Sequence, residues 1–118
     1  MDENSLNRAI EGSTYVIHTA APIIFAAENE EEELIKPIVG ATEAVMKACK
    51  THGVRRCVIT ATLGNVIFGY AMDDPERPTD SVFDERHFTK AENLPNGGIF
   101  SYMKAKALAE KAAWDYHA

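Results

Sequence analysis

Residues 101–106 read Ser-Tyr-Met-Lys-Ala-Lys, and they open a helix that the sequence predicts to continue through residues 107–116. Alanine, leucine, lysine and glutamate fill this segment, and these residues are strong helix formers. Tyr102 and Lys106 are four residues apart, so on a helix they share a face. An ammonium close to a phenol favours the phenolate and so eases proton donation to a substrate oxygen. The pair is therefore a candidate catalytic dyad, although a packed tyrosine beside a solvated lysine would show the same spacing.

The composition is that of one small acidic domain. The chain has 118 residues, of which 46% are hydrophobic and 25% charged, and this balance argues against wholesale disorder. The net charge of −6 makes nucleic acid and anionic membrane surfaces poor partners. No secretory leader is recognisable, and no run approaches the ~20 apolar residues of a membrane span. These features predict a cytoplasmic protein.

Neither the cysteines nor the acidic run predicts a metal site. Cys49 and Cys57 lack the spacing of metal ligands, and their apolar surroundings predict buried free thiols. Residues 28–33 include five glutamates, which we interpret as the solvated start of a helix, because acidic side chains complement the positive end of a helix dipole.

The first two thirds of the chain follow the pattern helix, strand, helix, strand. A short helix is expected over residues 2–11, and two mostly apolar runs, residues 14–20 and 56–62, are typical of strands buried in a parallel sheet. Between them, apolar residues from Leu34 to Cys49 form one helical stripe. Pro37 lies within it, so either the helix kinks there or its first turn is separate. The sequence therefore predicts a βαβ unit of the α/β class, with a right-handed crossover.

Residues 63–100 are expected to be irregular. Glycines and prolines interrupt this segment, with mixed charges between them. Connections of this length commonly carry function or cover a site.

Three stretches together resemble the extended short-chain dehydrogenase/reductases of the NAD(P)-dependent epimerase/dehydratase superfamily. The first strand ends in His-Thr-Ala-Ala-Pro (residues 18–22), the second in Thr-Ala-Thr (60–62), and the last helix carries Tyr102-x-x-x-Lys106 followed by Leu-Ala-Glu-Lys-Ala-Ala-Trp (108–114). The last run, together with Glu-Leu-Ile-Lys-Pro-Ile-Val-Gly-Ala-Thr (33–42), is more specific than the dyad. Within the group the chain is most similar to the dihydroflavonol reductase, cinnamoyl-CoA reductase and methylglyoxal reductase branch.

This resemblance implies a doubly wound, Rossmann-like parallel sheet and an NADP(H)-dependent reductase of small carbonyl compounds, with NAD(H) as the alternative cofactor. Tyr102 would be the general acid, Lys106 would lower the phenol's pKa and bind the nicotinamide ribose, and Thr62 would hold the substrate oxygen. The remaining cofactor-binding residues would be Thr19, Ala20, Ala21, Pro22 and Thr60. The family usually has serine where this chain has Ala61 and Thr62.

The chain also departs from the family pattern. No Gly-x-Gly-x-x-Gly occurs in it, and this is the turn that cradles the cofactor's pyrophosphate. We expect the strands that carry this turn to precede Met1 and the substrate-binding part to follow Ala118. Residues 1–118 would then be the central fragment of one NAD(P)-binding domain and inactive alone.

Two other functions are consistent with the sequence. The chain could be a non-catalytic remnant that acts as an interaction module through its helices. It could also derive from a sugar-nucleotide epimerase or a 3β-hydroxysteroid dehydrogenase, which share the Tyr-x-x-x-Lys helix. For each of these functions, we expect the helices to cover only one face of the two-stranded sheet. The chain could then self-associate through the uncovered face.

Overall fold

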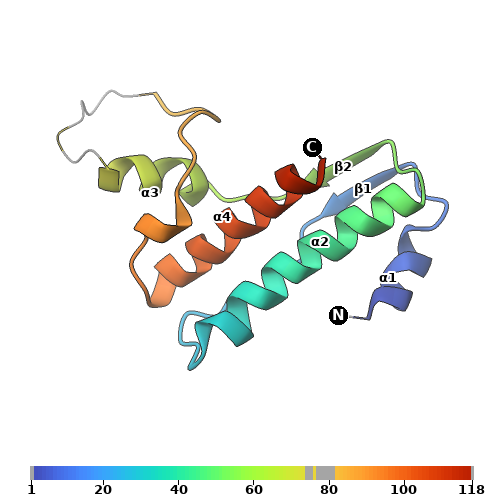
Figure 1. Cartoon of the computed structure of the whole chain (residues 1–118), viewed down its shortest axis with the longest axis horizontal. Coiled ribbons are helices and arrows are strands. Elements are labelled where there is room, and N and C mark those ends of the chain that lie inside the picture. The colour runs from blue at the N-terminus through green and yellow to red at the C-terminus, as the bar shows by residue number, and fades with distance from the viewer. Residues whose placement is uncertain (1, 74–75, 77–81, 118) are drawn as a thin grey trace.

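The computed structural model describes residues 2–73, 76 and 82–117. In chain order these form α1 (Glu3–Ile10), β1 (Tyr15–His18), a π-helical turn (Glu31–Ile35), α2 (Lys36–Thr51), β2 (Arg56–Ile59), α3 (Gly64–Asp73), a 3-10 turn (Ala91–Asn93) and α4 (Gly98–His117). Figure 1 shows α2 and α4 lying side by side, with α3 and α1 at opposite ends of the molecule. Among the described residues, no helix combines the length and apolarity needed to cross a membrane.

β1 and β2 form a two-stranded parallel sheet, which confirms the predicted α/β class. Their register sets Val16 opposite Cys57 and His18 opposite Ile59. Both strands are shorter than predicted. The Thr60 N–H donates to the His18 carbonyl at 3.0 Å, and beyond it the Thr62 carbonyl accepts from Asn65 and turns the chain into α3.

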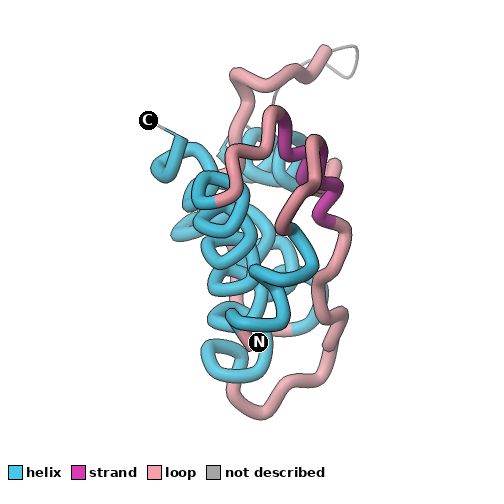
Figure 2. The backbone as a smooth tube through the Cα atoms, turned by 90° about the vertical axis from the view of Figure 1, so that its right-hand side faces the viewer, coloured by secondary structure: helices cyan, strands magenta, loops and turns pink. Residues whose placement is uncertain are grey.

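The helices cover one face of the sheet, as predicted. Side chains alternate along both strands: Val16 and Cys57 pack against a core of Ile10, Val45, Ala48 and Cys49. Tyr15, Ile17 and Val58 point the other way and are 64%, 71% and 49% exposed. Figure 2 shows the helices on one side of the strands. The described part of the chain places no element over the opposite, apolar face.

The acidic run lies at the start of the α2 segment, as predicted, and side chains also cap this start. The Asn29 side chain accepts from the Glu32 N–H at 3.2 Å, and the Glu33 carboxylate accepts from the Asn29 N–H at 2.8 Å, which is the reciprocal arrangement of a capping box. The first turn is π-helical, because the Lys36 N–H reaches the carbonyl of Glu31. Pro37 then occupies the first turn of α2, where its missing N–H costs little. Of the two alternatives at this proline, the structure shows a distinct first turn.

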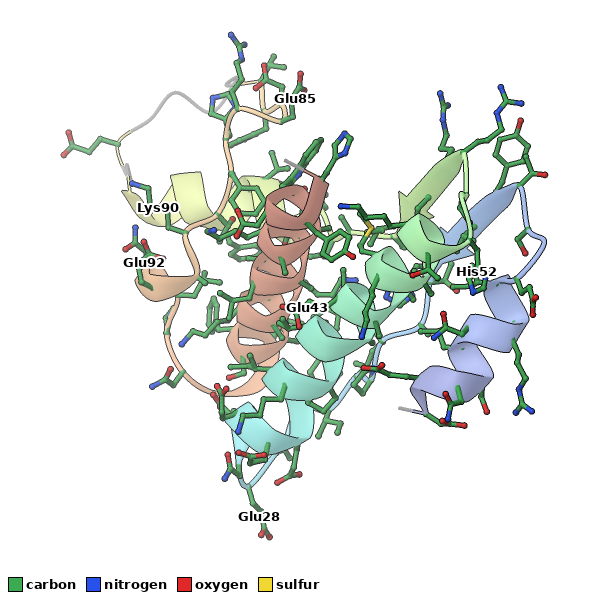
Figure 3. The ribbon with its side chains drawn as sticks, turned by 45° about the vertical axis from the view of Figure 1, so that its right-hand side comes forward. Glu28, Glu43, His52, Glu85, Lys90 and Glu92 are labelled. Atoms are coloured by element: carbon green, nitrogen blue, oxygen red, sulfur yellow. The ribbon has the colours of Figure 1, made fainter. Side chains whose placement is uncertain are left out.

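α1 packs against the C-terminal half of α2. Its N-cap Asp2 accepts from the Asn4 N–H at 3.1 Å, and Gly12, with φ of +74°, follows its last turn. Figure 3 shows His52 at the end of α2 beside α1. The His52 Nε2 lies 3.2 Å from the Asn7 side-chain oxygen, and this contact joins the two helix ends.

The prediction that residues 63–100 are irregular is wrong for two of its parts. Gly64–Asp73 is the helix α3, and Ala91–Asn93 is a 3-10 turn, while residues 74–75 and 77–81 lie outside the described residues. Gly64, which suggested a loop, instead allows close helix packing. A Cβ placed there would lie 3.1 Å from the Cγ of Met103 on α4.

α4 begins three residues before the expected Ser101. The Ser101 hydroxyl accepts from the Gly97 N–H at 2.8 Å and so satisfies a donor of the first turn. Gly97 has φ of +98°, which brings the chain into the helix by a conformation that favours glycine. The helix thus follows and includes a glycine pair, Gly97 and Gly98, in the segment that was expected to be irregular.

Candidate active site

Lys106 lies at the edge of the sheet where both strands end. It is only 8% exposed, and its ammonium donates to the Thr60 carbonyl at 2.6 Å. Burial lowers the pKa of Lys106, and the negative charge of Glu110 partly opposes this effect. An ammonium has three donors, and the described residues engage one of them through this carbonyl. A nearly buried cation with donors to spare is suited to bind acceptor oxygens of a ligand.

Tyr102 lies one turn earlier on α4 and is half-buried. Together with Ala21 it packs against a core cluster of Leu34, Ile38, Ala105 and Ala109. The structure therefore brings the predicted acid and part of the predicted cofactor-binding turn to the same cluster. The predicted role of Lys106 in lowering the pKa of the phenol stays a prediction.

The remaining predicted cofactor-binding residues lie at the same edge of the sheet. Thr19 and Ala20 follow β1 directly and are exposed, Pro22 is half-buried, and Thr60 follows β2 and is exposed. The carboxyl ends of parallel strands are where ligands bind in open α/β sheets.

Thr62 has a structural contact that the sequence did not indicate. Its hydroxyl oxygen accepts from the Gly64 N–H at 3.3 Å and so supports the start of α3. The side chain is half-buried. The predicted contact of this hydroxyl with a substrate oxygen stays a prediction.

His18 is a hydrogen-bonded core residue. It is buried on the helix side of β1, and its Nε2 lies 3.4 Å from the hydroxyl of Thr42 on α2. Burial, together with the nearby positive charge of Lys106, lowers the pKa of His18. The folded chain therefore resists protonation at this ring.

We expect the melting temperature to fall as the pH drops below the ordinary histidine value of 6.5. The unfolded chain takes up a proton at His18 in this range and the folded chain does not, so acid favours unfolding. Circular dichroism melts at a series of pH values would measure this, and His18→Gln should flatten the slope. His117→Gln, at an exposed position, is the matched control. An unchanged slope in His18→Gln would contradict the assignment.

Two polar residues of this region were missed by sequence reasoning. Asn65 of α3 is 1% exposed, and its amide Nδ2 donates to the Glu110 carboxylate of α4 at 2.6 Å. The backbone carbonyl of Asn65 accepts from the Thr89 N–H at 2.6 Å. An asparagine within an apolar run gives no signal of a partner 45 residues away.

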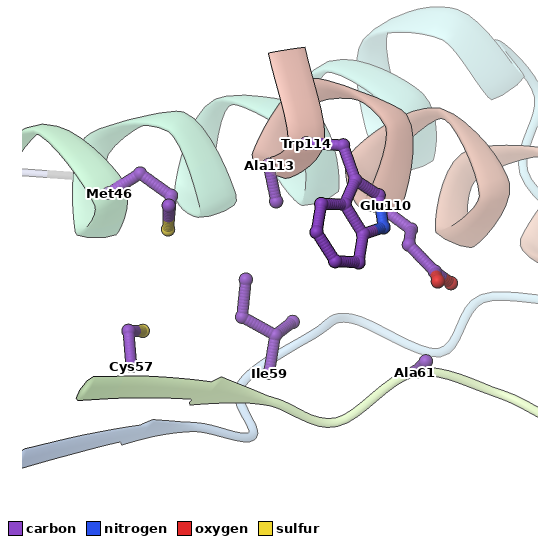
Figure 4. A pocket seen from close by; sticks show the side chains of 7 residues that line it. All are labelled: Met46, Cys57, Ile59, Ala61, Glu110, Ala113 and Trp114. Carbon is purple, nitrogen blue, oxygen red and sulfur yellow. The ribbon is translucent and has the colours of Figure 1, made fainter. Parts of the chain in front are cut away.

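A cavity of about 240 Å³ lies between the helices and β2. Figure 4 shows its lining residues, Met46, Cys57, Ile59, Ala61, Glu110, Ala113 and Trp114. Both cysteines are free, as predicted, but Cys57 is only half-buried because it borders this cavity. Burial and the neighbouring Cys57 thiol raise the pKa of Cys49 to about 11.

Residues 1–114 match the model of the 3-beta hydroxysteroid dehydrogenase/isomerase family. The chain belongs to this family. Its curated relatives include dihydroflavonol 4-reductase of Arabidopsis thaliana, 36% identical over 98% of this chain and 29% of the relative, and that of Zea mays, 38% identical over 99% and 32%. Anthocyanidin reductase of Vitis vinifera is 36% identical over 98% and 33%. These matches confirm the resemblance to the dihydroflavonol reductase branch.

Solved structures of reductases share the fold of this chain. Yeast methylglyoxal/isovaleraldehyde reductase Gre2, in complex with NADPH, has a TM-score of 0.78 and 25% identity, covering 97% of this chain and 34% of its own. Gre2 from Candida albicans, also in complex with NADPH, has a TM-score of 0.73 and 25% identity, covering 98% and 34%. The predicted partial Rossmann-like fold is thereby confirmed. The chain spans about a third of the length of the relatives it matches.

Proposed function

We propose that the chain is part of an NADP(H)-dependent reductase of aldehydes or ketones. The observation that carries the proposal is the nearly buried Lys106 ammonium, one helical turn after Tyr102 and at the carboxyl edge of the parallel sheet. Residues 1–118 would form the central part of one NAD(P)-binding domain. We place the protein in the cytoplasm, where the free thiols of Cys49 and Cys57 stay reduced.

The residues present fit a nicotinamide cofactor. Lys106 offers donors to sugar hydroxyls, and the small residues Thr19, Ala20, Ala21 and Pro22, together with Thr60, border the place where a dinucleotide crosses such a sheet. When bound, the cofactor supplies the hydride. Tyr102 would donate its proton to the carbonyl oxygen, and the Thr62 hydroxyl would hold that oxygen. We propose NADP(H) as the cofactor in place of NAD(H), because two of the similar structures are complexes with NADPH.

We expect the 118-residue chain alone to show no NADPH-dependent reduction of methylglyoxal or aromatic aldehydes. These residues contain no Gly-x-Gly-x-x-Gly, so they lack the backbone donors that anchor a pyrophosphate. In contrast, replacing the equivalent third of the yeast reductase with residues 1–118 should give a protein that binds NADPH and consumes it with methylglyoxal. Loss of NADPH absorbance measures turnover, and quenching of tryptophan fluorescence measures binding.

The control for the chain alone is its Tyr102→Phe variant. Turnover of the chain clearly above this control would show that the missing turn is dispensable. A folded graft that does not bind NADPH would overturn the proposed function, because the yeast reductase supplies every part of the cofactor site that lies outside residues 1–118.

A further inference from the structure

The amide of Asn65 is buried between α3 and α4 in an arrangement that core packing alone does not explain. Its Nδ2 donates to Glu110 at 2.6 Å, whereas its Oδ1 is buried and has no partner among the described residues. A buried acceptor without a partner costs stability, which an apolar side chain of similar shape would avoid. The amide is therefore present in spite of this cost.

The charge of Glu110 fixes the orientation of this amide. An ionised carboxylate can only accept hydrogen bonds, so the amide nitrogen has to face it and the amide oxygen has to face the core. Figure 4 shows the Glu110 side chain extending from α4 toward the chain that follows Ala61. Asn65 thus holds a carboxylate on the α3 side of α4.

Glu110 lies one helical turn after Lys106, where side chains four apart are neighbours. Its negative charge opposes the effect of burial on the pKa of Lys106. Yet among the described residues no ion pair joins the two side chains: Lys106 donates to the Thr60 carbonyl, and Glu110 accepts from Asn65. The carboxylate acts on the ammonium through its field without occupying the ammonium's donors.

We propose that Glu110 is a positioning residue for Lys106 and that Asn65 holds Glu110 in this role. The negative charge of Glu110 favours the ammonium form of the nearly buried lysine, and the Asn65 amide prevents the carboxylate from closing onto the ammonium. The donors of Lys106 then remain free for ligand oxygens. This inference deepens the proposed function and rests on it for the part in which Lys106 binds the cofactor.

The groups that face Lys106 come from two elements. His18 of β1 is the other titratable side chain that interacts with it, and the two positive charges disfavour each other. Glu110 on α4 is the negative charge. Among the titratable groups of the described residues, Glu110 is therefore the one that favours the charged state of this lysine.

A titration of Lys106 in the 118-residue chain tests the proposal. The chain is labelled with [13Cε]lysine, the Lys106 signal is assigned with Lys106→Arg, and its pKa is measured by NMR. Glu110→Gln should lower the pKa of Lys106, because the opposing charge is gone. Asn65→Leu should raise it, because the released carboxylate then pairs directly with the ammonium. Shifts of opposite sign are not expected from a merely structural role.

Two further variants serve as controls. Glu110→Asp retains the charge and should stay closer to the wild type than Glu110→Gln. Asp115→Asn removes a charge that pairs with Lys111 on the same helix and should leave the Lys106 signal unchanged. If circular dichroism shows that Asn65→Leu is unfolded, Asn65→Ser removes the same hydrogen bond with a smaller side chain.

The proposal is overturned if Glu110→Gln leaves the pKa of Lys106 unchanged, or if the Glu110 and Asn65 variants shift it in the same direction. The titration needs neither cofactor nor turnover. A failure of the grafted reductase to bind NADPH would therefore remove the link to the cofactor while the measured coupling between Glu110 and Lys106 would stand.

Discussion

Tyr102→Phe is expected to lower kcat for carbonyl reduction in the grafted reductase by about 10²–10⁴, the usual contribution of general acid catalysis. The variant loses only the phenolic hydroxyl. Its ring still packs against the cluster that includes Leu34 and Ala105, so the Kd for NADPH should be nearly unchanged. Steady-state kinetics and fluorescence titration separate the two quantities.

Lys106→Ala should impair both turnover and NADPH binding, since the same ammonium is assigned to the phenol and to the ribose. The matched control for Tyr102→Phe is Tyr116→Phe, which removes a hydroxyl from a more exposed position on the same helix. This control should alter neither quantity. A Tyr102→Phe enzyme that keeps half its activity would remove Tyr102 from the mechanism.

The second large effect concerns the oligomeric state of the 118-residue chain. We expect it to self-associate at micromolar concentration through the open face of its sheet. Tyr15, Ile17 and Val58 are exposed there, and the described residues leave the outer edge of each strand unpaired. At about 25 cal/mol per Å², covering a few hundred Å² of apolar sheet stabilises by several kcal/mol, which is comparable to the whole margin of a small domain.

Sedimentation of single-charge variants tests this surface. Ile17→Glu should shift the chain toward monomer and lower its melting temperature, because a charge cannot be buried in the contact without a partner. Val82→Glu is the matched control, since Val82 is 84% exposed and lies outside the sheet. A cooperative thermal transition from a strictly monomeric wild-type sample would contradict the prediction.

Much of the architecture was predictable because local signals agreed with the tertiary structure. Apolar runs indicated both strands, and the acidic run indicated the start of the α2 segment. α3 could not be predicted in the same way. Its glycines read as loop residues, and the reason for Gly64 is a contact with Met103 that exists only after folding.

Part of the candidate site was likewise predictable from the sequence, and part was not. Tyr102 and Lys106 were found from their spacing and from the residues that follow them. The Thr60 carbonyl and Asn65 were not, because Thr60 is 46 residues away from Lys106 in the sequence and Asn65 is 45 residues away from its partner Glu110. Residue types do not specify which of two donors a half-buried carboxylate will accept from.

The π-helical turn Glu31–Ile35 marks where this lineage can change its length. Such a turn holds one residue more than an α-helical turn, so it corresponds to a one-residue insertion. Deleting one residue there would restore an ordinary turn and rotate the residues before it, such as the exposed Glu28 and Asn29, at the cost of the Asn29 cap. The same deletion within Lys36–Thr51 would rotate Ile38 or Val45 away from the core. Insertions and deletions among homologues should therefore accumulate before Lys36.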